Sequence, residues 1–496
     1  MGIIEGKNYI GGMFVDGASG ERFESRNPAN FEEVLGTFPL SSGEDVNNAV
    51  SSAKVAYDCW RRLSRIRRGE YLDEFIRLVK KDHEEIARLM AKECGKGIIE
   101  CRADVTEGIH MAQYVFGTVR MPFGDIVASE IPEKDSFMRR KPKGVVAAIP
   151  AWNFPFAVPL WLICPSVVEG NTVVLKPSRE TACMGNMIAE YAQKAGFPKG
   201  VINVVQGACG DALVRHTDTH VVLFVGSNAV GSEIKKIVAG FDNKMAACEM
   251  GGKNALIVLD DANLELAVNA AVISAFKTSG QRCTSASRLI VHEKVFNEFE
   301  KMFVEITKRI KIGDPLDESV FMGPVINQAA TEKIAGYNDL AKKEGAEVLL
   351  DGGRLSDSTY KKGYFMSPFV YRMKHSRESR VLQEEVFGPH VAIIPVKDSD
   401  EAVEVYNDTE YGLACAVITE DYRKARKIRE ECEYGLGYVN LPTIGAEVHL
   451  PFGGVKKSGT GLPSGSALMD VVTHRTAWTV NHAAEIIMAQ GLTIKF

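Results

Sequence analysis

From Gly144 onward, short runs of β-branched residues bounded by Gly or Pro alternate with longer segments whose apolar residues recur at helical spacing. The predicted strands span 144–149, 171–176, 200–207, 220–226, 243–252 and 254–263, and the predicted helices span 155–170, 181–196 and 229–241. Repeated βαβ units with right-handed crossovers form a doubly wound domain around a parallel sheet. Ligands of such a domain bind at the carboxyl ends of its strands.

The segments on either side of this region predict further elements. Residues 8–28 contain glycines typical of a hairpin, and 45–95 are rich in helix formers with i, i+3, i+4 apolar spacing, so they should pack on the flank of the sheet. Downstream, the pattern predicts helices at 264–278, 293–312, 329–345, 398–408 and 421–433, and strands at 390–396, 414–420 and 437–442. This second βα series predicts a second α/β domain.

Composition excludes several classes of partner. The 496 residues suffice for about three folding units, and 59 basic against 64 acidic side chains give a net charge of −5. No basic surplus is available to hold a nucleic acid or an anionic membrane. The uncharged stretch Gly144–Val168 could span a bilayer by length, but its four prolines interrupt a membrane helix. We therefore expect no nucleic acid and no membrane among the partners.

The cysteines and the N-terminus indicate a cytoplasmic protein. Ten cysteines are too few for a disulfide framework, and no C-x-x-C or Cys/His pair has metal-ligand spacing, so no metal site is predicted. Near the N-terminus, Glu5 and Lys7 interrupt the apolar run that a signal peptide requires. Reduced thiols in a cytoplasmic enzyme or binding protein fit both observations.

Cys283 is the first candidate for chemistry. It follows the end of a predicted helix in the polar, small-residue sequence FKTSGQRCTSASRL, and a loop of this kind exposes a thiol. Cysteine is also among the most buried residue types, and nine other cysteines compete with this one. The neighbouring Arg282 can either raise the thiolate fraction or pair with an anionic substrate.

Two further polar residues stand at the ends of predicted strands. Glu249 precedes two glycines that allow close approach of a flat group, so its carboxylate is a candidate general base, although most glutamates are solvated or ion-paired. Asn153 lies among aromatic residues and prolines, and its amide must be paired by the local turn or by a ligand oxygen.

No G-x-G-x-x-G sequence opens any of the βαβ units, so the ordinary dinucleotide fingerprint is absent. The segment FVGSNAVG, which contains Gly226 and Ser227, joins a strand to the start of a helix. Free backbone donors at such a point suit a phosphate group.

Seven motifs taken together resemble the NAD(P)-dependent aldehyde dehydrogenase superfamily, in order and in separation. They are WNF at 152–154, LKPS at 175–178, FVGSNAVG at 224–231, EMGGKN at 249–254, GQRC at 280–283, EEVFGP at 384–389 and PFGGVKKSG at 451–459. The likeness runs from about Gly11 to Thr479. It implies a Rossmann-like cofactor domain (1–121 and 143–251), a second α/β catalytic domain (252–475) and a small β oligomerisation arm (122–142 and 476–496).

The resemblance implies a role for each candidate residue. Cys283 is the nucleophile that attacks the aldehyde to give a thiohemiacetal, and Asn153 with the backbone N–H of Cys283 holds the oxyanion. Loss of hydride to the nicotinamide leaves a thioester, which Glu249 hydrolyses by activating water.

The same likeness implies the cofactor contacts. Lys176 and Ser178 meet the adenosine ribose, Trp152 and Ser227 the pyrophosphate, and Glu385 with Phe387 the nicotinamide ribose and ring. Gly226 also belongs to this cofactor site. Many NAD-preferring members carry Glu at the position of Arg179, and a Glu there would repel the 2′-phosphate of NADP. The positive charge of Arg179 can instead pair with that phosphate. We therefore expect NADP or NAD as cofactor, with NADP accepted.

The sequence departs from the family pattern at two other places, and it does not identify the substrate. Ala151 replaces the usual proline before the WNF motif, and Leu462 with Pro463 replaces a common Arg-Glu pair. The loop 442–450 is similar to the aldehyde-anchoring loop of members that oxidise carboxylate-bearing semialdehydes, and Arg282 is a candidate for binding such an anion. A neutral aldehyde fits nearly as well, so sequence does not identify the aldehyde or the pathway.

Segments 136–144 and 476–486 lie where the family places its oligomerisation strands, which predicts a homodimer or homotetramer without choosing between them. Two alternative functions remain: transfer of the acyl group to coenzyme A, or a non-catalytic binding or structural protein of the same fold. The presence of Glu249 argues against the first, and intact Cys283, Glu249 and Asn153 argue against the second.

Overall fold

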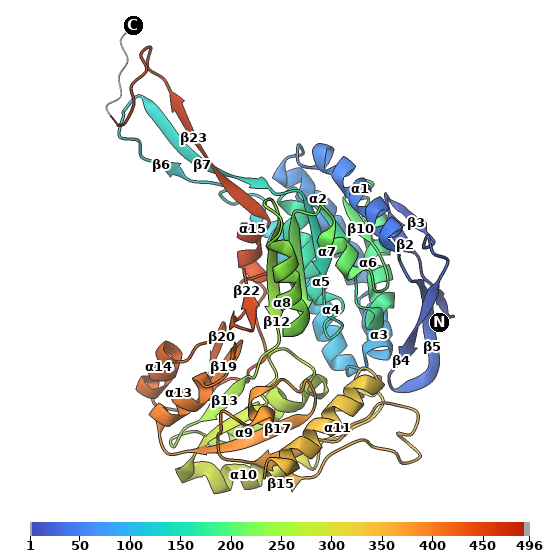
Figure 1. Cartoon of the computed structure of the whole chain (residues 1–496), viewed down its shortest axis with the longest axis vertical. Coiled ribbons are helices and arrows are strands. Elements are labelled where there is room, and N and C mark those ends of the chain that lie inside the picture. Colours follow the sequence, from blue (N-terminus) through green and yellow to red (C-terminus); the bar gives the residue numbers. More distant parts are fainter. Residues whose placement is uncertain (1, 491–496) are drawn as a thin grey trace.

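A computed structural model describes residues 2–490, which form two α/β units, one above the other, and an arm that projects from the upper unit (Figure 1). The predicted mixed α/β architecture with a small β arm is confirmed. The last six positions of the predicted arm, 491–496, lie outside the described residues. None of the helices within 2–490 combines the length and the apolar character that crossing a bilayer requires.

The upper unit is built on an eight-stranded sheet. In spatial order its strands are β22 (Gly459–Thr460), β12 (Met245–Met250), β11 (Val221–Gly226), β8 (Val145–Ile149), β9 (Thr172–Leu175), β10 (Ile202–Val204), β2 (Asn8–Ile10) and β3 (Met13–Val15). The five strands from β12 to β10 are parallel, as the βαβ pattern predicts. The short strand β22, which follows the lower unit in the chain, joins the edge antiparallel to β12 and pairs Gly459 with Glu249.

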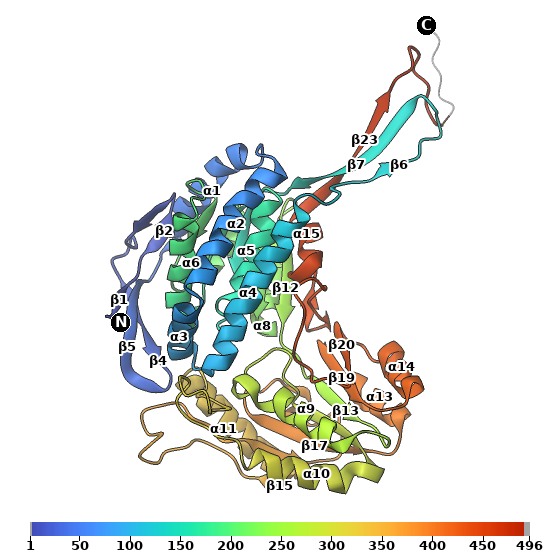
Figure 2. The same cartoon turned by 180° about the vertical axis from the view of Figure 1, so that it is seen from behind.

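Helices cover both faces of this sheet (Figures 1 and 2). The helices are α1 (Gly43–Trp60), α2 (Arg65–Lys81), α3 (His83–Cys94), α4 (Ile98–Thr118), α5 (Ala157–Val168), α6 (Ala182–Lys194), α7 (Gly210–Arg215) and α8 (Asn228–Val238). Because side chains alternate along a strand, Val145 and Ala147 pack with α1, α7 and α8, whereas Val146 and Ala148 pack with α2 to α6. The loops after β8, β11 and β12 therefore share one edge, where the site is built.

The sequence pattern did not predict α4, although it is the longest helix of the upper unit. Its buried residues include Val105 and Met111 but also the acids Glu100 and Asp104. Carboxylates on the buried face disguise the apolar period from which helices are predicted.

The lower unit contains a seven-stranded sheet. Its order is β15 (Glu347–Leu350), β16 (Phe369–Arg372), β17 (His390–Val396), β14 (Arg288–His292), β13 (Ala255–Val258), β19 (Ala414–Ile418) and β20 (Leu436–Val439). Helices α9 (Leu264–Phe276) and α10 (Glu293–Thr307) pack on one face, and α11 (Gln328–Lys343), α12 (Arg380–Gln383), α13 (Ser399–Asn407) and α14 (Tyr422–Glu431) belong to the rest of the unit. The predicted second βα series is thus present.

Three smaller sheets complete the described residues, 2–490. The arm pairs β23 (Thr473–Asn481) with β7 (Lys134–Pro142) and β6 (Ile126–Val127), and α15 (Leu468–Val471) leads into it. A second sheet joins β1 (Ile4–Glu5), β5 (Asn30–Pro39) and β4 (Arg22–Asn27), and a two-stranded sheet joins β18 (Tyr411–Gly412) to β21 (Val455–Lys456). The predicted N-terminal hairpin is the pair β2 and β3, and the rest of segment 8–28 turns away to form β4.

Candidate active site

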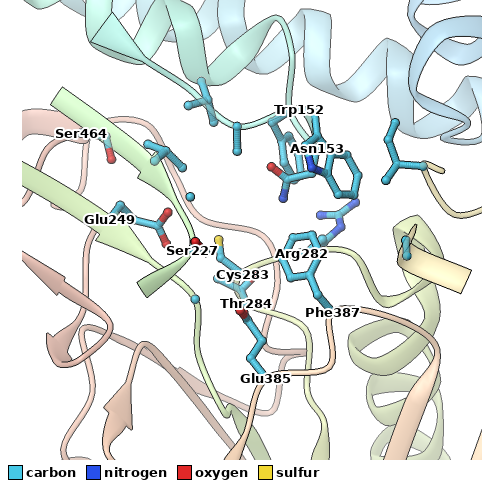
Figure 3. Close-up of a pocket in the computed structure, with 18 of the residues that line it drawn as sticks. Trp152, Asn153, Ser227, Glu249, Arg282, Cys283, Thr284, Glu385, Phe387 and Ser464 are labelled. Atoms are coloured by element: carbon cyan, nitrogen blue, oxygen red, sulfur yellow. The ribbon is translucent and has the colours of Figure 1, made fainter. Parts of the chain in front are cut away.

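A cavity of about 410 Å³ lies between the upper and lower units. Ala151 after β8, Gly226 at the end of β11 and Glu249 near the end of β12 line it from the upper unit, as expected for the carboxyl ends of parallel strands. Cys283 and Glu385 line it from the lower unit. Figure 3 shows the side chains of Glu249, Cys283 and Glu385 around one space.

The loop that carries Cys283 is held in an unusual backbone conformation. Helix α9 ends at Phe276, two residues before the predicted end, and a 3₁₀ turn follows in which Thr278, Ser279 and Gly280 all have φ between 55° and 70°. A Cβ on Gly280 would lie 2.3 Å from the carbonyl oxygen of Gly388, so glycine is required there. Left-handed residues in succession cost free energy and persist because the surrounding structure enforces them.

Asn254 fixes the same loop from the lower sheet. Its Nδ2 donates to the carbonyl oxygen of Cys283 at 2.6 Å and to that of Ser285 at 3.0 Å, while its Oδ1 accepts from the N–H of Ala414 at 2.8 Å. The final residue of the EMGGKN motif therefore positions the thiol loop, a role that the sequence analysis did not identify.

Cys283 differs from the other cysteines in accessibility. Eight are buried, Cys59 is exposed at the surface, and Cys283 is half-buried against the cavity. Burial, and then the nearby Glu249 carboxyl, raise the pKa of the Cys283 thiol well above its usual value, and Arg282 opposes this only in part. The sequence suggests that Arg282 could raise the thiolate fraction, but in the structure desolvation outweighs the effect of Arg282 on the pKa of the thiol. Ionising the thiol therefore requires a base.

Glu249 meets that requirement in position and in pKa. Its side chain is 2% exposed, and burial raises its pKa to about 8, against a smaller opposing effect of Cys283. Its Oε1 is buried without a hydrogen-bond partner in the described part of the chain. A carboxyl with this pKa can exchange a proton near neutral pH, where an ordinary glutamate cannot.

Asn153 lies on the opposite side of Cys283 from Glu249 (Figure 3). Its Nδ2 donates to the carbonyl oxygen of Gln281 at 3.0 Å, so the local loop satisfies the amide. The N–H of Cys283 donates to no acceptor among residues 2–490. Two N–H donors, one side chain and one backbone, therefore flank the thiol.

The other half of the cavity contains the predicted cofactor residues. Ser227 caps α8 by accepting from the N–H of Val230, and Gly226 beside it lines the cavity. Trp152 and Phe387 meet edge to face at 5.6 Å, and Phe387 holds a positive φ of 63°. This helix start and aromatic pair offer backbone donors and a flat contact surface.

Glu385 explains the two glycines that follow Glu249. Its carboxylate accepts from the N–H of Gly252 at 3.1 Å, and a Cβ on Gly251 would lie 2.1 Å from its Oε2. The flat group that approaches these glycines is, in this structure, the Glu385 carboxylate.

Comparison with known proteins agrees with this geometry. The sequence profile of the aldehyde dehydrogenase family matches residues 14–477. The chain is 37% identical to the α-ketoglutaric semialdehyde dehydrogenase of Bacillus subtilis, over 94% of this chain and 96% of that protein. It is 39% identical to the 1-pyrroline-5-carboxylate dehydrogenase of Staphylococcus epidermidis, over 90% and 87%. The chain belongs to the aldehyde dehydrogenase family.

Solved structures support the same assignment for this oxidoreductase. Betaine aldehyde dehydrogenase from Staphylococcus aureus in complex with NAD⁺ superposes with a TM-score of 0.93 at 32% identity, covering 97% of this chain and 96% of that one. This aldehyde dehydrogenase thus acts on small aldehydes, and its family membership covers both α/β units.

Three predicted cofactor residues of the dehydrogenase lie outside the lining of this cavity. Lys176 and Ser178 follow β9, where Lys176 Nζ donates to the carbonyl oxygen of Pro177 at 3.1 Å and Ser178 Oγ accepts from the N–H of Glu180 at 3.3 Å. The Arg179 guanidinium lies over the Phe23 ring, 5.0 Å from its centroid. They share the edge on which β8 and β11 end, but an extended ligand is needed to link them to Cys283.

Arg282 of the dehydrogenase lines the cavity, but its charge is already paired. Nη2 donates to Glu100 Oε1 at 2.7 Å, Nε donates to Thr278 Oγ1 at 2.7 Å, and the guanidinium lies 4.9 Å from the centroid of Phe154. Substrate binding by Arg282 stays a prediction, since an anion would have to share this cation with Glu100.

Sequence analysis missed two charged residues of the cavity wall, and the first is Glu107 on α4. The signal that could have found it is the spacing of Glu100, Asp104 and Glu107, which puts three acids on one face of a largely apolar segment. It also missed Lys333 of α11, which lines the cofactor half.

Proposed function

We propose that this dehydrogenase oxidises an aldehyde to the carboxylic acid with NAD(P)⁺, using Cys283 as nucleophile, Glu249 as base and Asn153 as oxyanion donor. The observation that carries the proposal is the convergence of a half-buried thiol, a carboxyl of pKa about 8 and a donor amide on one cavity. Each group has a distinct task in acyl chemistry.

Proton transfer begins the reaction. At pH 7 about a tenth of a carboxyl with a pKa of 8 is ionised, and that fraction accepts the Cys283 proton. The thiolate then adds to the aldehyde carbon, and the developing alkoxide receives hydrogen bonds from Asn153 Nδ2 and the Cys283 N–H. Donors placed in this way contribute about 3 kcal/mol each to the transition state.

The second half-reaction hydrolyses the thioester. Glu249 gives its proton to solvent, then removes a proton from a water molecule as that water attacks the acyl carbon, and Cys283 leaves as thiolate. The pKa of about 8 suits this exchange, because a general base works best near the operating pH.

The cofactor half of the cavity fits a nicotinamide dinucleotide. The start of α8 at Ser227 offers backbone N–H donors for a pyrophosphate, with Gly226 and Trp152 beside it, while Glu385 and Phe387 are available to the nicotinamide ribose and ring. A bound nicotinamide would supply the hydride acceptor. The NAD⁺ complex of the related betaine aldehyde dehydrogenase supports this class of cofactor.

The adenosine end of the cofactor is assigned to the residues after β9. Lys176 and Ser178 are proposed to contact the ribose, and Arg179 to admit the 2′-phosphate of NADP. Kinetics with NAD⁺ and NADP⁺ test this directly.

The substrate, assembly and location of the dehydrogenase are finer proposals. The names of the relatives support a carboxylate-bearing semialdehyde, whereas the pairing of Arg282 with Glu100 gives that anion no free cation at this residue. The arm exposes Ile126, Trp478 and Val480, which supports a homodimer or homotetramer. We propose a cytoplasmic enzyme, since eight of its ten thiols are buried and unpaired.

The proposal divides the chain by role. Residues 1–121 and 143–251 bind the cofactor, 252–475 carry the catalytic cysteine, and 122–142 with 476–490 form the oligomerisation arm. The two units meet at the cavity, so neither alone supplies both Glu249 and Cys283.

A panel of aldehydes and semialdehydes with NAD⁺ and NADP⁺, followed by absorbance of the reduced nicotinamide, tests the function. We expect acid and reduced cofactor in equal amounts, without a requirement for coenzyme A. Consumption of coenzyme A would favour the acyl-transferring alternative, and the absence of turnover with every aldehyde would favour a binding or structural role.

A further inference from the structure

One face of α4 carries three acids, Glu100, Asp104 and Glu107, at positions i, i+4 and i+7. Arg282 donates to Glu100, and Lys96 Nζ forms an ion pair with Asp104. Glu107 forms no hydrogen bond or ion pair with any residue of 2–490, and it lines the cavity. Of the three acids, Glu107 alone offers its charge to a ligand.

The position of Glu107 is fixed by close helix packing. A Cβ on the next residue, Gly108, would lie 3.0 Å from Leu160 Cδ1, so α4 approaches α5 closely at this point. Asp104 Oδ1 also accepts from the N–H of Ala157 at 2.7 Å, which ties the start of α5 to α4. Because α5 contributes Trp161 to the same cavity, Glu107 stands at a defined place beside that wall.

The charges around Glu107 come from three directions. Asp104 and Lys96 lie along α4 and just before it, Arg282 lies on the Cys283 loop, and Tyr438 faces Glu107 from β20. Burial and then Asp104 raise the pKa of Glu107 to about 8, while Arg282 and Lys96 oppose the rise. A carboxyl that is costly to ionise in the empty cavity ionises readily once a cation binds beside it.

The neighbouring wall also suits a cation. Trp161 and Phe452, both lining the cavity, meet edge to face at 4.9 Å. Aromatic rings attract a cation, most strongly at their faces. The nearby cations are engaged elsewhere, since Lys96 Nζ and the Arg282 guanidinium both lie over the Phe154 ring, at 4.1 Å and 4.9 Å.

We propose that Glu107 is a specificity-determining residue whose carboxylate accepts a hydrogen bond from a protonated amine on the far end of the aldehyde, so that the preferred substrates are amino-aldehydes. This inference rests on the proposed function. The amine keeps its proton on binding, and the neutral Glu107 carboxyl releases its own to solvent, so charge and protons balance.

The test compares three short aldehydes on the full-length enzyme and its Glu107→Gln variant. The first is 3-aminopropanal, which carries an ammonium group. The second is butanal, in which a methyl group replaces that ammonium, and the third is the anion 4-oxobutanoate. A hydrogen bond between charged groups predicts that kcat/KM for 3-aminopropanal falls by about 10- to 100-fold in E107Q. Butanal should change by less than about threefold, and 4-oxobutanoate should improve because the cavity loses a negative charge.

Butanal serves as the internal control. If E107Q slows all three aldehydes equally, Glu107 has only a structural role and the inference is overturned. If it slows 4-oxobutanoate alone, the neutral carboxyl donates to an anion, which overturns the inference in favour of a carboxylate-bearing substrate. If the wild-type enzyme oxidises other aldehydes of the panel but not 3-aminopropanal, the inference is overturned while the proposed function stands. Only the absence of turnover with every aldehyde contradicts the proposed function as well.

Two matched variants separate local from general electrostatics. Glu107→Asp keeps the charge and should retain part of the preference for 3-aminopropanal over butanal. Glu318→Gln removes an exposed acid outside the cavity lining that forms an ion pair with Arg102 on α4. That variant should leave the preference within about twofold of wild type, because exposed charges are screened; a loss equal to that in E107Q would overturn the role of Glu107.

Discussion

Glu249 at the end of β12 and Glu107 on α4 are two carboxyls of the same cavity with the same altered acidity, and their neighbours make them different. Burial raises the pKa of each to about 8. Glu249 faces the Cys283 thiol, whereas Glu107 faces ion pairs and an aromatic wall. A raised pKa does not by itself assign a role, since burial also raises the pKa of Glu93 outside the cavity to about 7. The groups beside each cavity carboxyl indicate whether it suits reaction or recognition.

This comparison predicts two patterns of mutational effect. Changes beside Glu249 should slow every aldehyde by the same factor, since they act on atoms common to all substrates. Changes at Glu107 should alter the ranking of aldehydes, since they act on the part that varies.

The largest effect is expected for Cys283→Ala. Without a nucleophile no thiohemiacetal forms, and kcat should fall by at least about 10⁴-fold for all three aldehydes. Cofactor binding, measured by quenching of protein fluorescence, should persist. The matched control is Cys59→Ala at the exposed cysteine, which should keep full activity; residual turnover in C283A above this limit would remove Cys283 from the mechanism.

Glu249→Gln should reduce steady-state turnover by about 10²- to 10⁴-fold. Stopped-flow absorbance should show a burst of reduced cofactor that is slower than in the wild type, because Cys283 loses its base, and then a stall, because the thioester is no longer hydrolysed. In the wild type, kcat should rise with pH with a midpoint near pH 8, where half of Glu249 is ionised, and level off about one pH unit higher. An unchanged pH profile in E249Q would assign that ionisation to another group.

Asn153→Ala should lower kcat by about 10²-fold through the loss of one oxyanion donor. Its amide also holds the carbonyl oxygen of Gln281, so KM for the cofactor and the melting temperature must be measured alongside. A fall in kcat that is equal for 3-aminopropanal and butanal, with KM for the cofactor unchanged, supports the oxyanion role. A change confined to KM would indicate a positioning role instead.

The sequence predicts the secondary structure around Glu249 better than the secondary structure around Glu107. The strands that end beside Glu249 were predictable because buried parallel strands are continuous apolar runs, as in Val145–Ile149. Helix α4 was not, because Asp104 and Glu100 replace apolar residues on its buried face and find their cations only in the tertiary structure.

In the candidate site, too, some features are predictable from the sequence and others depend on the folded structure. The resemblance of short motifs was enough to select Cys283, Glu249 and Asn153, which the cavity brings together. Arg282 pairs with Glu100, 182 positions away, and burial together with Glu249 raises the pKa of Cys283. These effects arise from tertiary contacts and leave no local signal in the sequence. Charge and accessibility, unlike identity, are properties of the folded state.

The smallest expected effect is on thermal stability, and it should be similar for Glu107 and Glu249. Their pKa values are raised in the folded protein, from 4.5 to about 8, so each favours the folded state most below pH 4.5 and loses this contribution as pH rises through 8. Replacing either by Gln removes that loss, so E107Q and E249Q should both melt a few °C higher than the wild type at pH 9, by roughly 2–5 °C, with a smaller difference at pH 6. Differential scanning calorimetry at the two values measures this. If only one variant gains, the two sites are not electrostatically equivalent, and the contrast in their catalytic effects can no longer be attributed to neighbours alone.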